Sequence, residues 1–158
     1  MESLPLIAVL ATALATFPGR VHESRSPNRS AVVKWVEAEG ENPHRLILSA
    51  GRTETELLRF PRSVTLAWSP DSKFIAVTDR VGSDQSALHL FSVETPKREI
   101  RIHLPKEAAE ILEANHHAYA EVLGWRGHHF RVRVRGYGAK GSREQSINIW
   151  CEASGECQ

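Results

Sequence analysis

The chain has 158 residues, a length typical of one domain, and its formal net charge is +1. Hydrophobic residues make up 41% of the chain and charged residues 25%, as in an ordinary globular protein. So small a net charge excludes a general attraction to nucleic acids, and no specific nucleic-acid partner is expected. No internal stretch approaches the roughly 20 apolar residues of a spanning helix, so no transmembrane segment is expected in the mature chain.

The N-terminus differs from the rest of the chain. Residues Leu4 to Phe17 carry no charge, which suits the apolar region of a signal peptide, and Ala13-Leu14-Ala15 offers a cleavage pattern. We therefore predict a signal peptide over residues 1–15, a flexible polar segment over residues 16–30 and a periplasmic or secreted protein. Glu2 departs from the basic start of such peptides, and a buried N-terminal helix is the alternative.

The two cysteines, Cys151 and Cys157, enclose five residues that include Gly155. In an oxidising compartment this pair is expected to form a disulfide. The chain-entropy model assigns roughly 2 kcal/mol to so short a loop. Two free thiols or half of a metal site are the alternatives, although one isolated pair at this spacing is a poor zinc signal.

Strand patterns dominate residues 31–158, which we expect to form a single domain. Apolar alternation or continuous apolar runs predict strands over residues 32–36, 45–49, 64–68, 74–77, 88–93, 100–104 and 130–135. A polar connection is expected over residues 51–56, and Ser69-Pro70-Asp71-Ser72 is typical of a tight turn. One helix is expected from Pro105 to Ala114, because proline is tolerated in the first helical turn.

An internal repeat accompanies these patterns. Leu66-Ala-Trp-Ser69 matches Leu123-Gly-Trp-Arg126, and each copy continues as strand, polar hairpin, strand. Repeated meanders of this size bury the face of each unit on its neighbour. Trp68 and Trp125 are therefore expected to be equivalent apolar anchors between adjacent sheets.

A resemblance to a known family follows from the first copy. The stretch from Trp68 to Val77 (WSPDSKFIAV), followed by an apolar strand that ends at Phe91, resembles the propeller repeat of TolB and prolyl-oligopeptidase proteins, and more distantly a WD repeat. The likeness covers residues 64–104 well and residues 119–150 loosely, and Ser72 stands where that repeat usually has glycine. It also extends to small exported bacterial proteins of unassigned function, which share the hairpin Gly82-Ser-Asp-Gln-Ser86.

The resemblance implies two propeller-blade-like repeats and not a complete propeller, which needs at least about four blades. We therefore expect an all-β protein: an antiparallel meander with one short helix inserted between the two repeats.

Catalytic and metal-binding patterns are weak in this sequence. There is no G-x-S-x-G nucleophile elbow and no phosphate-binding glycine loop in a strand–helix context. Asp79 and Asp84 flank one hairpin and are most simply solvated carboxylates. The histidine doublets at 116–117 and 128–129 fit a shared metal ion only if each contributes one ligand, because adjacent strand residues point to opposite faces. No catalytic residue, cofactor or metal site is assigned.

The sharpest local feature is the segment Phe130-Arg-Val-Arg-Val-Arg135. Its strict alternation places Arg131, Arg133 and Arg135 on one face of a strand, where they form a candidate anion-binding surface. A charged strand that resists edge pairing, or arginines paired with glutamates of a neighbouring strand, are the alternatives. The sequence favours an exported, non-enzymatic binding module for an unknown protein or anionic ligand. A small exported hydrolase or metal-dependent enzyme is the alternative.

Overall fold

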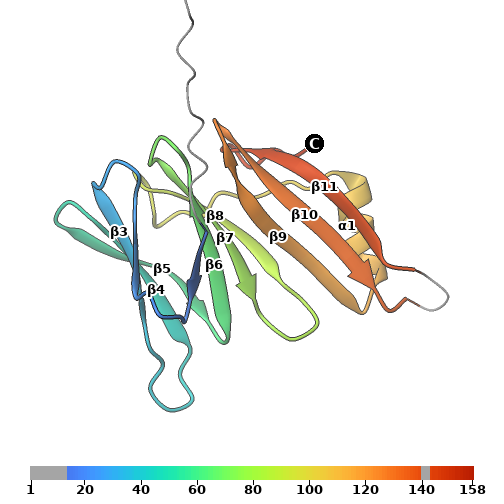
Figure 1. The fold of residues 1–158 in the computed structure, drawn as a ribbon, viewed down its shortest axis with the longest axis horizontal. Helices are drawn as coiled ribbons and strands as arrows, with labels where there is room; N and C mark the ends of the chain where they lie inside the picture. The colour runs from blue at the N-terminus through green and yellow to red at the C-terminus, as the bar shows by residue number, and fades with distance from the viewer. Residues whose placement is uncertain (1–13, 140–142) are drawn as a thin grey trace, which may run out of the picture.

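The computed structural model describes residues 14–139 and 143–158. Within these residues the chain forms eleven strands and one short helix, arranged as three antiparallel sheets and no closed barrel. Figure 1 shows the three sheets side by side in chain order. The expected all-β class with one short helix is confirmed.

The first sheet has the strand order β2-β3-β4-β5. Its strands are β2 (Glu23–Arg25), β3 (Ala31–Val36), β4 (His44–Ala50) and β5 (Thr53–Phe60). The polar connection expected at 51–56 is wrong, because most of it belongs to β5. Gly51 has a φ of 60° in the turn before Thr53, so β4 and β5 form a tight hairpin whose second strand begins with alternating Thr and Glu.

The central sheet has the order β1-β6-β7-β8. Its strands are β1 (Ala15–Phe17), β6 (Ser63–Trp68), β7 (Phe74–Arg80) and β8 (Ala87–Ser92). The turn between β6 and β7 is held by Asp71, whose carboxylate accepts the Ser69 hydroxyl at 2.6 Å and the Lys73 amide at 3.0 Å. Ser72 has a φ of 65°, a left-handed conformation that glycine adopts more readily.

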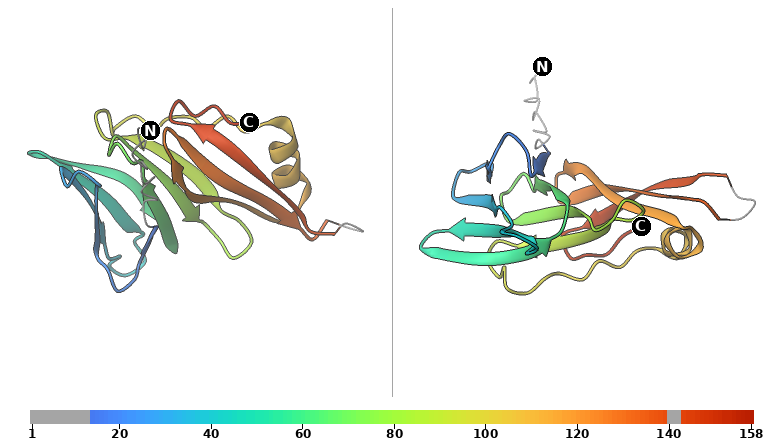
Figure 2. Two further views of the ribbon diagram at one scale, coloured as in Figure 1. Left: turned by 45° about the horizontal axis from the view of Figure 1, so that its top comes forward. Right: turned by 90° about the horizontal axis from the view of Figure 1, so that it is seen from below.

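The third sheet has the order β11-β10-β9. Its strands are β9 (His117–Arg126), β10 (His129–Tyr137) and β11 (Gln145–Glu152). Helix α1 (Lys106–Ala114) connects the central sheet to β9, as expected, and lies beside the third sheet (Figure 2). Its buried residues Ala108 and Ile111 pack in one cluster with apolar side chains of β10.

The central sheet is buried on both faces, which explains the unbroken apolar run of β7. Ile75 and Val77 pack towards the first sheet, whereas Ala76 packs towards the third sheet. A strand that is covered on both sides requires apolar residues at successive positions. The two copies of the sequence repeat correspond to β6–β8 and β9–β11, and the first sheet adds a third meander that the repeat did not indicate.

The N-terminal part of the chain differs from the expectation. Residues 1–13 of the expected signal peptide lie outside the described residues. Residues 16–30, expected to be flexible, contain most of β1 and all of β2, which pair with β6 and β3. Phe17 is fully buried in the core between the first and central sheets. Strand pairing of β1 and β2 and the burial of Phe17 order this segment, although most of its residues are polar.

The prediction of a strand at residues 100–104 is also wrong. Within this segment only His103 forms an isolated bridge, opposite Glu156. Glu99, just before the segment, forms another opposite Phe91. It runs along the edge of the central sheet and then reaches the C-terminal segment of the chain. In the part of the chain that the structure describes, no helix combines the length and apolar character needed to cross a membrane.

Candidate functional site

Two buried tryptophans join the sheets. Trp68, at the end of β6, is 2% exposed and donates its indole N–H to the Ser24 hydroxyl of the first sheet at 3.0 Å. Trp125, near the end of β9, is 3% exposed and donates to the Ala67 carbonyl of the central sheet at 2.9 Å. Each indole therefore reaches from its own sheet to the preceding one.

The joint between the central and third sheets has additional hydrogen bonds. The Val122 amide donates to the Thr78 hydroxyl at 2.8 Å, and the Tyr119 hydroxyl donates to the Ser83 carbonyl at 2.7 Å. The Ser86 hydroxyl donates to the Ala120 carbonyl at 3.0 Å. These contacts fix β9 against the β7–β8 hairpin and so define which face of the third sheet is exposed.

The arginines Arg131, Arg133 and Arg135 lie on that exposed face, which we call the outer face of the third sheet. Cross-strand register fixes its members, because directly opposed residues of an antiparallel pair share a face. They are His117, Tyr119, Glu121, Gly124, Arg126, His129, Arg131, Arg133, Arg135, Tyr137, Ser146, Asn148, Trp150 and Glu152. On the opposite face the intervening residues of β10 are fully buried: Phe130, Val132 and Val134.

Two of the three arginines are neutralised by glutamates. Arg133 Nη2 lies 2.7 Å from Glu121 Oε2, and Arg135 Nη2 lies 3.4 Å from Glu121 Oε1. Arg135 also lies 3.9 Å from Glu144. Burial raises the pKa of Glu121, but the two guanidinium groups outweigh burial and hold the pKa below its usual value of 4.5. Cross-strand pairing, one of the alternatives left open by the sequence, therefore involves Arg133 and Arg135.

Arg131 is different. Among the described residues it forms no ion pair, and its guanidinium carbon lies 6.0 Å from the ring centroid of Trp150 on the neighbouring strand. Arg135 makes a closer contact of the same kind with Tyr119, at 4.5 Å. Trp150 is 39% exposed, an unusual position for so large an aromatic side chain. The face thus combines arginine with exposed aromatic rings.

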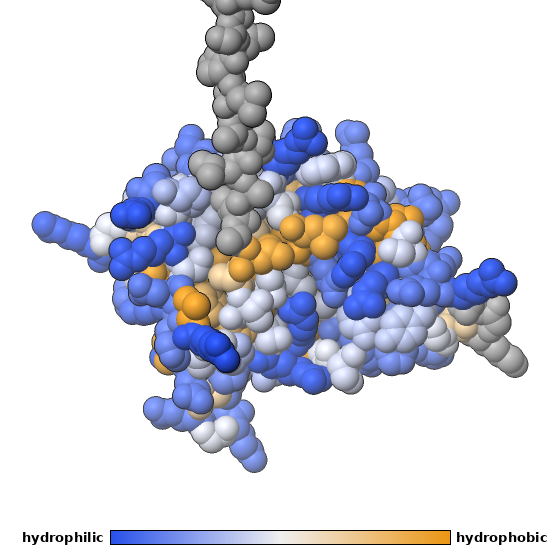
Figure 3. All heavy atoms as spheres, viewed as in Figure 1, coloured by the Kyte–Doolittle hydropathy of each residue, from blue (hydrophilic) through white to orange (hydrophobic). Residues whose placement is uncertain are grey.

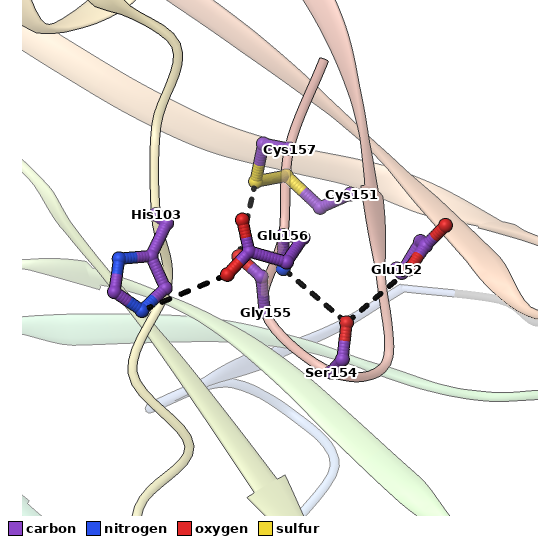
Figure 4. Close-up of a disulfide and its surroundings, with 7 residues drawn as sticks. All are labelled: His103, Cys151, Glu152, Ser154, Gly155, Glu156 and Cys157. Atoms are coloured by element: carbon purple, nitrogen blue, oxygen red, sulfur yellow. Dashed lines mark hydrogen bonds and ion pairs between the residues drawn. A yellow bond between two sulfur atoms is a disulfide. The ribbon is translucent and has the colours of Figure 1, made fainter.

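The C-terminal loop borders this face. A disulfide joins Cys151 to Cys157, and Figure 4 shows it closing the loop between β11 and the last residues. The Gly155 carbonyl accepts the His103 amide at 2.8 Å. Gly155 has a φ of 95°, and a Cβ atom there would stand 2.0 Å from the Arg101 carbonyl oxygen, so only glycine fits.

A hollow of about 500 Å³ opens beside the disulfide loop. It begins where β9 ends and β10 starts, and it continues over the end of β11 to the last residues of the chain. Its lining residues are Arg126, His129, Trp150, Glu152, Glu156 and Gln158. Sequence reasoning missed this hollow and the exposure of Trp150, because both depend on how the C-terminal residues pair with β11.

A second polar cluster lies at the β8 edge of the central sheet. The ring of His89 on β8 lies between the carboxylates of Asp79 and Glu99, with Nε2 3.4 Å from Asp79 Oδ2 and Nδ1 in contact with Glu99 Oε1. Burial lowers the pKa of His89, but the two carboxylates outweigh burial and raise it above 6.5. Asp79 is only 4% exposed, which corrects its interpretation as a solvated hairpin carboxylate.

The histidine doublets do not come together. His117 begins β9 and stacks on Tyr137, whereas His129 begins β10 at the other end of the same strand pair. The separation of the two ends is roughly 25 Å at the usual rise per strand residue, too far for one ion. Among the described residues no group of three or more His, Cys, Asp or Glu side chains is placed to hold a metal ion.

Figure 3 shows one side of the molecule as mostly hydrophilic, with a band of hydrophobic residues across its middle. The fold and surface define an all-β protein of three packed meanders with a disulfide-closed C-terminal loop. No protein-family model matches the sequence, and no curated protein matches it.

Proposed function

We propose that this chain is an exported, non-enzymatic binding module that docks its partner on the outer face of the third sheet. The observation that carries the proposal is the combination of Arg131, Trp150 and the tyrosines Tyr119 and Tyr137 on one exposed sheet face. Arginine, tryptophan and tyrosine are the residues most enriched at the energetic centres of interfaces. The disulfide fits export, because such bonds persist in oxidising compartments.

The partner that we propose for this face is anionic. Arg131, Arg133 and Arg135 present three guanidinium groups, and Glu121 offsets part of that charge. Binding is therefore expected to be moderate and to weaken with salt, since exposed charges are screened within about 10 Å at 0.1 M. The propeller-blade character of the sheets remains part of the same proposal.

The test is a titration at low salt with heparin, an oligonucleotide and anionic vesicles. A variant with all three arginines of β10 changed to glutamine should lose binding. A matched control changes Arg25, Arg45 and Arg59 of the first sheet to glutamine, because these arginines are also exposed and also lie beside glutamates. Equal binding by wild type and the β10 variant, or no binding by wild type, would refute an anionic partner.

Export is tested separately in the native host. Mass spectrometry of the mature protein should show an N-terminus near Thr16, because the Ala13-Leu14-Ala15 pattern directs cleavage there. Cleavage after Ala15 removes one of the three residues of β1 and keeps Phe17 in the core. Intact protein that begins at Met1 in the cytosol would refute export.

A further inference from the structure

The hollow beside Trp150 has a mixed lining that restricts what it can bind. Arg126 and His129 line it beside the β9–β10 turn together with the carboxylates of Glu152 and Glu156, and His129 Nε2 already lies 3.8 Å from Glu152 Oε1. An anionic ligand in the hollow would face two carboxylates, and a cationic ligand would face the guanidinium. A neutral ligand avoids both conflicts, because burying an unpaired like charge is costly.

The same lining offers both donors and acceptors. Arg126 donates only, the two carboxylates accept only, and Gln158 does both. A hydroxyl group donates one hydrogen bond and accepts two, so a ligand rich in hydroxyls can bond to each of these groups beside their present partners, Ser154 at 3.3 Å from Glu152 and His103 at 3.8 Å from Glu156. The volume of about 500 Å³ lies within the range of small-molecule sites in proteins.

Trp150 supplies a flat apolar wall to this polar hollow. Its indole is 39% exposed and lines the hollow, while Arg131 contacts the ring at 6.0 Å and helps to hold it in place. A pyranose ring has an apolar face of C–H groups and a rim of hydroxyls. Such a ring fits a site with one aromatic wall and polar side chains around it.

The hollow is also preorganised. The Trp150 amide donates to the Gln158 carbonyl at 3.0 Å, the Gln158 amide donates back at 2.8 Å, and the Glu152 amide donates to the Glu156 carbonyl at 2.8 Å. The Cys151–Cys157 disulfide lies between these two pairs and links the same two segments (Figure 4). The main-chain positions of Trp150, Glu152 and Glu156 are therefore fixed before a ligand arrives, which reduces the entropy cost of binding.

We propose that this hollow binds a sugar ring of a neutral saccharide, stacked on Trp150 and hydrogen-bonded by Glu152, Glu156 and Arg126. The proposal goes beyond the proposed function: the sugar is neutral, whereas the partner proposed for the arginines is anionic, and the hollow lies at the disulfide-bordered end of the same face. The arginines of β10 then extend from the sugar site along the sheet.

The test uses soluble neutral oligosaccharides: cellohexaose, maltohexaose, laminarihexaose and fully N-acetylated chitohexaose. Each is titrated into the oxidised full chain; the Trp150 indole N–H resonance is followed by NMR in wild type, and the affinities of wild type and variants are measured by isothermal titration calorimetry. At least one is expected to shift this resonance, and Trp150→Ala should weaken its affinity about tenfold or more, as loss of an aromatic anchor does. Leu123→Ala is the matched control, because Leu123 of β9 is exposed to a similar extent, 38%, and does not line the hollow.

The proposal is overturned if no probe shifts the Trp150 resonance at millimolar concentration, or if Trp150→Ala binds as wild type does. Equal weakening by Leu123→Ala would also overturn it, because the effect would then not belong to the hollow. The result of the saccharide test can be separated from the result of the heparin test of the proposed function. If the arginine variant loses heparin binding while no neutral saccharide binds, the anionic docking face stands and the sugar site falls.

Discussion

The first and third sheets both pack one face on the central sheet and expose the other, yet their exposed faces differ. The first sheet exposes charged pairs such as Lys34–Glu54 at 2.8 Å and Arg59–Glu56 at 3.2 Å. Among the described residues none of its strands exposes a large hydrophobic side chain. The third sheet adds exposed Trp150 and Tyr137 to its arginines. Charge alone keeps a sheet face soluble, whereas arginine with exposed aromatic rings is typical of a binding face.

The hydrogen bonds that join the first and third sheets to the central sheet also differ. Trp68 joins the first sheet through the side chain of Ser24, whereas Trp125 joins the third sheet through the main-chain carbonyl of Ala67. The second joint has a further row of hydrogen bonds between β9 and the β7–β8 hairpin, whereas the first joint has one from the Asn28 amide to the Ser72 hydroxyl at 2.9 Å. The third sheet is therefore positioned by directional contacts, which a defined binding face requires.

The largest effects are expected at the tryptophans. Trp68→Ala and Trp125→Ala should each lower the free energy of unfolding by roughly 3–5 kcal/mol, because each removes a large buried aromatic ring. Chemical denaturation measures both losses. Phenylalanine at each position sharpens the comparison, since it keeps an aromatic ring and removes the indole donor. A loss below about 1 kcal/mol for either alanine variant would contradict its role as an anchor.

Removal of the disulfide should have the next largest effect. Cys151→Ser combined with Cys157→Ser is expected to cost roughly 2 kcal/mol, from the entropy of a short closed loop. Hydrogen exchange should show faster exchange at the Trp150 and Gln158 amides and unchanged exchange in β3 and β4. Equal loss of protection in the first sheet would show that the disulfide does not act locally.

The His89 cluster predicts a pH dependence of stability in the central sheet. The pKa of His89 is raised above 6.5 in the folded state, so its contribution is fully present below pH 6.5 and is lost as the pH rises through the folded pKa. Wild type should therefore lose stability relative to His89→Gln as the pH rises above 6.5. The exposed His103 provides the control: His103→Gln should follow the wild-type profile. Parallel profiles for wild type and His89→Gln would contradict the prediction.

The smallest effects should come from the exposed faces. Glu121 is 13% exposed in its side chain and contacts two arginines, so Glu121→Gln should cost about 1 kcal/mol. Glu56 of the first sheet also contacts two arginines but is 36% exposed, so Glu56→Gln should cost less than about 0.5 kcal/mol. Thermal unfolding at pH 7 compares the two variants, and a larger loss for Glu56→Gln would reverse the comparison.

Local patterns predicted much of the fold. Period-two alternation predicted the arginine face of β10, the tight turn at Ser69–Ser72 was found, and the short helix begins directly after Pro105. These features depend on residues a few positions apart. The strand expected at 100–104 failed, because its alternation is satisfied by packing along an edge without a full partner strand.

The sequence by itself determined the all-β class, the helix between the repeats, the cysteine pair and the alternation of β10, because each follows from side-chain spacing along one segment. Only the tertiary structure decided which sheet each tryptophan reaches, that Glu121 neutralises Arg133 and Arg135, and that Asp79 is buried against His89. It also placed Trp150 beside Gln158 and Glu156 in one hollow. Those contacts depend on cross-strand register and sheet packing, which bring together residues that no local pattern relates.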